Sequence, residues 1–210
     1  MELLVRGSNW DYRTGGMWRA LTIGRQSDLA ESKWLSDMLA VFIGAALLAT
    51  GLNSFLIFLF RPGEQSFLWF SIFVLVMAIR TLVTGEYLGA AILPVEAMIR
   101  LEYMTTFANL PACSLFLMRF FPGLASRRDQ YSLVLPSLVF LAFIFFLPLP
   151  WLTRTMPWYY PFGFAGCAWL LIRLILPACR ERRQGSFLLL AGTIVLAACA
   201  DNDALYGAFK

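Results

Sequence analysis

Six long runs of apolar residues, separated by short polar segments, follow one another from residue 38 onward. The runs cover residues 38–60, 66–86, 96–121, 131–150, 156–179 and 186–206. The hydrocarbon core of a bilayer is about 30 Å thick and needs about 20 residues of α-helix to cross it. Each run reaches that length, the second and the sixth only with charged residues inside them. The pattern therefore predicts an all-α integral membrane protein whose residues 37–210 form a polytopic bundle of six spans.

Residues 1–36 follow a different pattern, with short β-like segments at 3–5 and 17–23. Turn-rich stretches around Gly7 and Gly15 separate these segments. Two strands in about 30 residues are too few to bury a core by themselves. We expect residues 1–36 to be the remnant of a β domain that lies outside the membrane, with Met1 at a fragment boundary.

The composition agrees with a membrane location and narrows the chemistry. Hydrophobic residues make up 60% of the chain and charged residues 14%, with a mean hydropathy of +0.69, whereas soluble domains carry about 25% charged residues. The chain has no histidine, which excludes Ser-His-Asp catalysis, HExxH zinc sites and a phosphoacceptor histidine. The four cysteines lie in or beside apolar runs without a CxxC pair. We therefore expect no enzyme activity, no metal and no cofactor.

The basic residues of the loops predict the orientation. The loops after the first, third and fifth runs contain seven arginines: Arg61, Arg119, Arg127, Arg128, Arg180, Arg182 and Arg183. The loops after the second and fourth runs contain only Arg154. Basic loops stay in the cytoplasm, so the N-terminus is predicted to be outside. The net charge of +4 follows this topology, and no basic face with interleaved aromatic residues indicates nucleic-acid binding.

Charged residues inside the runs form the candidate site. At 1.5 Å per residue, Arg80 lies about 21 Å above Ser66, and Glu102 lies about 9 Å below Glu96. Asp201 and Asp203 come to about 22 and 25 Å above Ser186, so all four charges fall in the outer third of the bilayer. Two interpretations stay open: an ion pair of Arg80 with Glu102, favoured over Asp201, that locks the bundle, or a polar pocket that binds a ligand from outside.

Four further predictions concern the borders of this site. Arg100 and Glu102 are two residues apart and point to different faces, so Arg100 is expected to pair with Glu96 or to snorkel outward. Glu86 is expected at the outer rim. The polar side chains of Asn53 and Asn109 are expected to form interhelical hydrogen bonds. An interfacial aromatic belt is predicted from the residues that flank the outer loop between the fourth and fifth runs: Trp151, Trp158, Tyr159 and Tyr160.

The order of several motifs resembles the bacterial seven-transmembrane receptors with diverse intracellular signalling modules. The motifs are Ala78-Ile79-Arg80-Thr81-Leu82, Gly85-Glu86-Tyr87, Arg100-Leu101-Glu102-Tyr103, Arg119-Phe120-Phe121-Pro122 and Asp201-Asn202-Asp203-Ala204-Leu205-Tyr206. Near the N-terminus, Val5-Arg6-Gly7-Ser8-Asn9 is similar to the last strands of the extracellular β-sandwich sensor domain of that family.

The resemblance implies a receptor in the bacterial inner membrane that senses an extracytoplasmic small molecule, with carbohydrate-like compounds as the suggested class. A cytoplasmic signalling module in the full-length protein would receive the signal, and a homodimer is compatible with the family. The chain departs from the pattern because most of the sensor domain, the seventh helix and the effector are missing. The alternative is a secondary transporter, although no inverted repeat is visible and the charges do not lie at the midplane.

Overall fold

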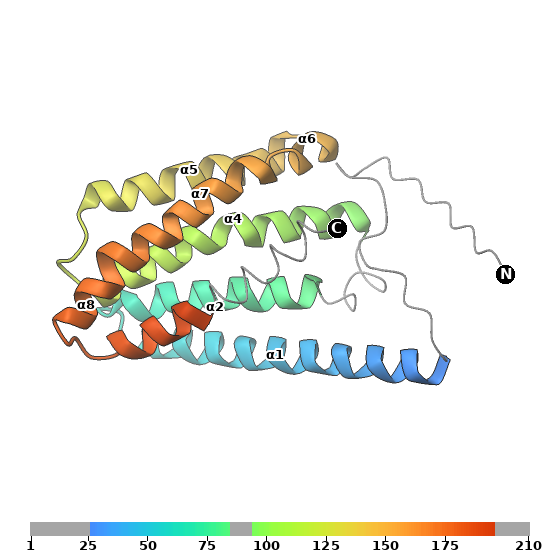
Figure 1. Cartoon of the computed structure of the whole chain (residues 1–210), viewed down its shortest axis with the longest axis horizontal. Coiled ribbons are helices and arrows are strands. Elements are labelled where there is room, and N and C mark those ends of the chain that lie inside the picture. The colour runs from blue at the N-terminus through green and yellow to red at the C-terminus, as the bar shows by residue number, and fades with distance from the viewer. Residues whose placement is uncertain (1–25, 85–93, 196–210) are drawn as a thin grey trace.

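The computed structural model describes residues 26–84 and 94–195, which form a bundle in which successive long helices run in opposite directions (Figure 1). The helices are α1 (Gln26–Phe60), α2 (Gln65–Thr84), α4 (Val95–Phe120), α5 (Arg127–Phe146), α6 (Leu149–Thr153), α7 (Met156–Leu170), the π-helix η1 (Leu171–Ile175), α8 (Leu176–Arg180) and a last helix, Ser186–Val195. Within the described residues, the structure confirms the predicted all-helical architecture.

Among residues 26–84 and 94–195, four segments are long and apolar enough to cross a membrane: Lys33–Phe60, Gln65–Thr84, Arg127–Phe146 and Met156–Arg180. They correspond to the first, second, fourth and fifth predicted spans. α4 occupies the third predicted span over 26 residues, but it carries four charged residues and is not among the four. The sixth predicted span is described only over Ser186–Val195. The count of six spans is therefore not confirmed, whereas several membrane-spanning helices are present.

The first helix begins earlier than the sequence pattern predicts. Residues 26–36, assigned above to the β remnant, are helical and continue without a break into the first span. These eleven residues contain no glycine or proline, and Asp28 lies in the first turn, where a negative charge favours the helix N-terminus. The prediction of a β remnant for residues 1–25 falls outside the described residues.

α1 and α2 pack closely through a seam of small residues. Gly44 faces the side chain of Leu82, and Gly51 faces that of Leu75, so that residues seven apart on one helix meet residues seven apart on the other. A Cβ atom at either glycine would lie only 2.8 Å from the opposing leucine side chain. The buried Ser71 hydroxyl donates to the Gly51 carbonyl at 2.8 Å. These contacts fix the antiparallel register of the two helices.

α4 is the central helix of the bundle and packs against α2, α5 and α7. It contributes buried residues to two apolar clusters, one toward each end of the bundle. The first cluster includes Leu117, Phe121 and Leu174, and the second includes Tyr103, Phe107 and Tyr159. Because α4 is surrounded by other helices, it can carry more polar residues than the helices that face lipid.

Prolines set several of the helix ends and irregularities. α5 ends at Phe146, before Pro148, and its N-terminus at Arg127 is stabilised by a capping box between Ser126 and Asp129. The fourth span is therefore shifted toward the N-terminus relative to the predicted 131–150. In the fifth span, Pro177 cannot donate to the carbonyl of Arg173, and the preceding turn is the π-helix η1.

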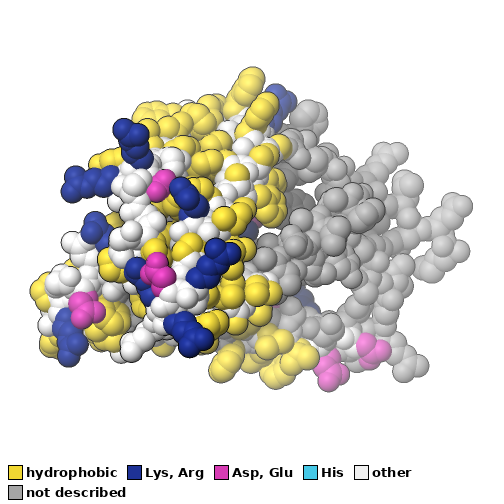
Figure 2. All heavy atoms as spheres, turned by 60° about the vertical axis from the view of Figure 1, so that its left-hand side comes forward, with side chains coloured by type: hydrophobic (Ala, Val, Ile, Leu, Met, Phe, Trp, Pro, Cys, Tyr) yellow, Lys and Arg dark blue, Asp and Glu magenta, His cyan; other side chains and the backbone are white. Residues whose placement is uncertain are grey.

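The short loops 61–64, 121–126 and 181–185 lie at the same end of the bundle (Figure 1). Figure 2 shows this end, where basic side chains, all of them arginines in the loops and helix ends named here, gather. Six arginines there are exposed: Arg61, Arg119, Arg127, Arg128, Arg180 and Arg182. We call this region the basic end. The exposed Trp151, Trp158 and Tyr160 lie near the other end of the bundle, as expected of residues at a membrane interface.

Candidate functional site

Arg80 forms a polar contact between α2 and α4. Its guanidinium donates a hydrogen bond to the hydroxyl of Thr106, and this hydroxyl donates in turn to the backbone carbonyl of Glu102 at 2.8 Å. The hydroxyl of Thr105 donates to the same carbonyl at 2.8 Å. Arg80 and Thr106 are half-buried, so the positive charge is partly removed from water and from lipid.

The predicted ion pair between Arg80 and Glu102 is not formed in the structure. The depth estimate placed the two residues level with each other, but the register of the antiparallel helices brings Arg80 beside Thr106, one turn further along α4. One turn corresponds to about 5 Å. The predicted contact between the second and third spans is thus correct, with a hydroxyl as the direct partner.

Tyr159 of α7 adds a third helix to this contact. Its side chain is 4% exposed, and its hydroxyl donates to the backbone carbonyls of Thr106 and Phe107 at 3.3 and 3.5 Å. The carbonyl of Phe107 has no helical donor four residues on, because that residue is Pro111. The assignment of Tyr159 to the interfacial aromatic belt is therefore wrong. In the sequence, Pro111 indicates that the carbonyl of Phe107 lacks a helical donor and is free to accept from another helix.

Aromatic rings surround Tyr159 and hold it against α4. The ring centroids of Phe107 and Tyr159 are 4.7 Å apart, and Phe140 lies 5.4 Å from the first and 5.2 Å from the second. Helices α4, α5 and α7 each contribute one ring to this triangle. We call Arg80, Thr106 and Tyr159 the polar node, because together they connect α2, α4 and α7.

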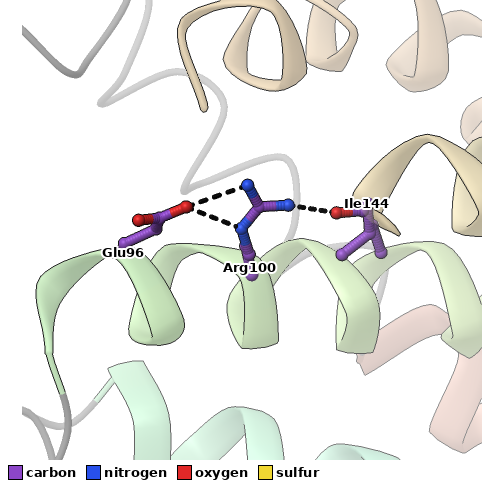
Figure 3. Close-up of polar contacts among 3 residues, drawn as sticks. All are labelled: Glu96, Arg100 and Ile144. Carbon is purple, nitrogen blue, oxygen red and sulfur yellow. Dashed lines mark hydrogen bonds and ion pairs between the residues drawn. The ribbon is translucent and has the colours of Figure 1, made fainter. Parts of the chain in front are cut away.

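Arg100 makes a second polar bridge, this time from α4 to α5 (Figure 3). It forms an ion pair with Glu96 at 2.9 Å and also donates to the carbonyl of Ile144. That carbonyl lacks its helical donor because the residue four positions on, Pro148, has no N–H. Arg100 thus pairs with Glu96 as predicted and faces α5, whereas Thr106 faces α2. This bridge therefore satisfies a free carbonyl near the C-terminal end of α5 and is separate from the polar node.

Asn109 follows the polar node on the same side of α4, three residues after Thr106. Its side-chain oxygen is buried and has no hydrogen-bond partner among the residues that the structure describes. The expectation of an interhelical hydrogen bond from this oxygen is therefore not met, and Asn53 is exposed. Of the remaining candidate residues, Glu86, Asp201 and Asp203 lie outside the described residues. Within the described ranges, His, Cys, Asp and Glu form no group that could hold a metal ion.

The fold and these contacts define a multi-pass helical membrane protein with polar side chains between its helices. A family model, 7TM diverse intracellular signalling, matches residues 36–209, which is most of the chain. The chain therefore belongs to this family of transmembrane signalling receptors, in agreement with the resemblance of its motifs. Searches among curated proteins and among solved structures found no match.

Proposed function

We propose that this chain is the membrane domain of a receptor that detects a small molecule outside the bacterial inner membrane and relays the signal to a cytoplasmic module. Carbohydrate-like compounds are the proposed class of ligand. In this proposal the chain has no catalytic activity of its own, residues 1–25 belong to the end of an extracytoplasmic sensor domain, and the bundle completes six spans. A homodimer is compatible with it.

The polar node is the observation that carries the proposal. It lies in the half of the bundle away from the basic end, and it connects three helices through one charged side chain and two hydroxyls. With the basic end in the cytoplasm, the node is on the side from which an extracytoplasmic ligand arrives. A ligand that competes for Arg80 would change the contacts of α2, α4 and α7 together. Glu102, Glu86, Asp201 and Asp203 are proposed to contribute to the same polar region, with Arg100 as its structural neighbour.

The test is a thermal-stability screen of neutral and acidic sugars with the purified chain in lipid nanodiscs. A ligand of the node should raise the melting temperature of the wild type but not that of Arg80→Leu. The control is Arg61→Gln, which removes a charge at the basic end and should respond like the wild type. Equal stabilisation of the wild type and both variants would contradict a role of the node in binding.

The alternative function, a secondary transporter, is distinguished from the receptor by measuring uptake of the same sugar into sealed vesicles that contain the protein. The receptor proposal predicts binding without accumulation of the sugar. Accumulation above vesicles without protein would favour the transporter.

A further inference from the structure

Arg173 is an exposed arginine inside a membrane-spanning segment. It lies in η1, seven residues before Arg180 at the end of the span, which corresponds to about 10 Å along a helix. Its neighbours Ile172 and Leu176 are exposed apolar residues, while Leu174 and Ile175 are buried. Arg173 therefore projects from the side of the helix that meets lipid. A charge in hydrocarbon is costly, so its guanidinium is expected to extend toward the headgroups of the basic end.

α5 lies beside the fifth span just before Arg173. A Cβ at Gly166 of α7 would be 3.3 Å from the side chain of Leu133 of α5, and Leu133 belongs to the same buried apolar cluster as Leu174 of η1. Asp129 lies in the first turn of α5, four residues before Leu133. Asp129 is already engaged, since its carboxylate accepts from the backbone and the hydroxyl of Ser126, each at 2.8 Å. Asp129 thus offsets only part of the positive charge along the seam between α5 and η1–α8.

Other charges around the seam are mainly positive. Arg127 and Arg128 begin α5, and Arg180 and Arg182 follow η1; all four are exposed. Glu181 is paired with Arg183 at 2.7 Å, so this pair adds no net charge. Together with Arg173 these arginines make five positive charges along the seam, and among the described residues only the carboxylate of Asp129 opposes them.

The backbone of Arg182 supports a role for its charge. Arg182 has a φ of 51°, and the N–H groups of Arg182 and Arg183 donate to the carbonyls of Cys179 and Ala178. These bonds form a Schellman motif, in which glycine is the usual residue at the position of Arg182. An arginine in this strained conformation keeps a cation at the rim of the seam, where glycine would stabilise the loop but carry no charge.

We propose that the seam between α5 and η1–α8 binds the phosphate headgroup of an anionic phospholipid. Arg173 and Arg180 bind the phosphate, Arg128 and Arg182 contribute at the rim, and the acyl chains lie on exposed apolar residues such as Ile172 and Leu135. A lipid is favoured over a soluble anion because the site begins inside the span and continues onto an apolar surface. Since the lipid would contact α5 and the fifth span together, its presence would affect how these helices pack.

The experiment measures binding of phosphatidylglycerol and of phosphatidylcholine to the purified full chain by native mass spectrometry. An arginine near an anionic surface contributes about 1 kcal/mol, which corresponds to about fivefold in affinity. We expect Arg173→Gln and Arg180→Gln each to weaken phosphatidylglycerol binding about fivefold, and the double variant about 25-fold. Arg61→Gln, with the same loss of charge at the same end but on the α1–α2 loop, should change the affinity less than twofold.

Three results would overturn the proposal. Equal binding of the two lipids would show that the headgroup charge is not recognised. An equal loss in Arg61→Gln would indicate a diffuse basic ring without a site. Competition by glycerol phosphate as strong as by the lipid would identify a site for a soluble anion. If Arg173→Gln does not fold, the decision rests on Arg180→Gln, which changes an exposed helix end, and on Arg173→Lys, which keeps the charge and should keep binding within about threefold.

Discussion

Arg80 illustrates how this bundle accommodates a charge between its helices. The guanidinium donates to a hydroxyl on the neighbouring helix, and that hydroxyl donates to the backbone carbonyl of Glu102. A hydrogen bond to a charged group stabilises a protein by about 1.5–3 kcal/mol. The sequence predicted that Arg80 belongs with α4, because its depth and the short connection place the second and third spans side by side. It did not predict the partner, since a shift of one helical turn is within the uncertainty of a boundary.

The hydrogen bond between Arg80 and Thr106 leads to the first prediction. Arg80→Leu should lower the free energy of unfolding by about 1.5–3 kcal/mol, and Thr106→Val by about 1 kcal/mol. Because each change removes the same hydrogen bond, the double variant should lose less than the sum of the two single losses, by about 1 kcal/mol. The measurement is reversible unfolding of the four proteins in mixed detergent micelles. Thr106→Ser keeps the hydroxyl and serves as the control; simple additivity of the two changes would show that the residues do not interact.

The helices differ in polarity according to their neighbours. α4 is the central helix and carries four charges, whereas α1 packs on α2 and exposes large apolar residues such as Phe42 and Leu56. Hydrophobic runs therefore predicted the existence of the helices well, with errors of a few residues at most ends. They predicted less about the start of α1, because the helix over residues 26–36 has no apolar run to mark it.

Tyr159 shows why the contacts of the site were harder to predict than its helices. Aromatic residues near the end of a span usually lie at the membrane interface, and its neighbours Trp158 and Tyr160 are indeed exposed. Only the packing of α7 on α4 turns Tyr159 inward, toward carbonyls near Pro111. Which side of a helix faces a partner depends on the order of the helices in the bundle, and one sequence does not specify that order.

The α1–α2 seam leads to a second prediction. Gly51→Leu should destabilise the protein by about 1–3 kcal/mol, because the added side chain would overlap that of Leu75. Leu75→Ala should recover part of this loss in the double variant, since it removes the overlapping atoms. Gly192→Leu is the matched control, because a Cβ at that helical position meets no packing neighbour within 4 Å among the described residues. Thermal unfolding in detergent measures all four variants, and a Gly51→Leu protein as stable as the wild type would contradict the close packing of the seam.

The whole molecule has two chemically different ends. Exposed arginines gather at the end formed by the loops 61–64, 121–126 and 181–185, while Trp151, Trp158 and the polar node lie toward the other end. In the membrane, this asymmetry gives the bundle a direction. The proposed relay requires that direction, because the node must face the side of the ligand and the basic end must face the signalling module.

The orientation of the bundle in the membrane therefore tests the proposed direction of signalling. Single cysteines at Gly63, at Gln184 and at Thr155 are introduced into a variant without the four native cysteines, and cells with a permeabilised outer membrane are treated with a membrane-impermeant maleimide. Gly63 and Gln184 lie in loops of the basic end, and a Cβ at Gly63 meets no neighbouring atom of the described residues within 4 Å, apart from those of the adjacent residues. We predict labelling of residue 155 while the inner membrane is intact, and labelling of residues 63 and 184 only after the inner membrane is opened. Labelling of residues 63 and 184 while the inner membrane is intact, with residue 155 protected, would contradict this orientation.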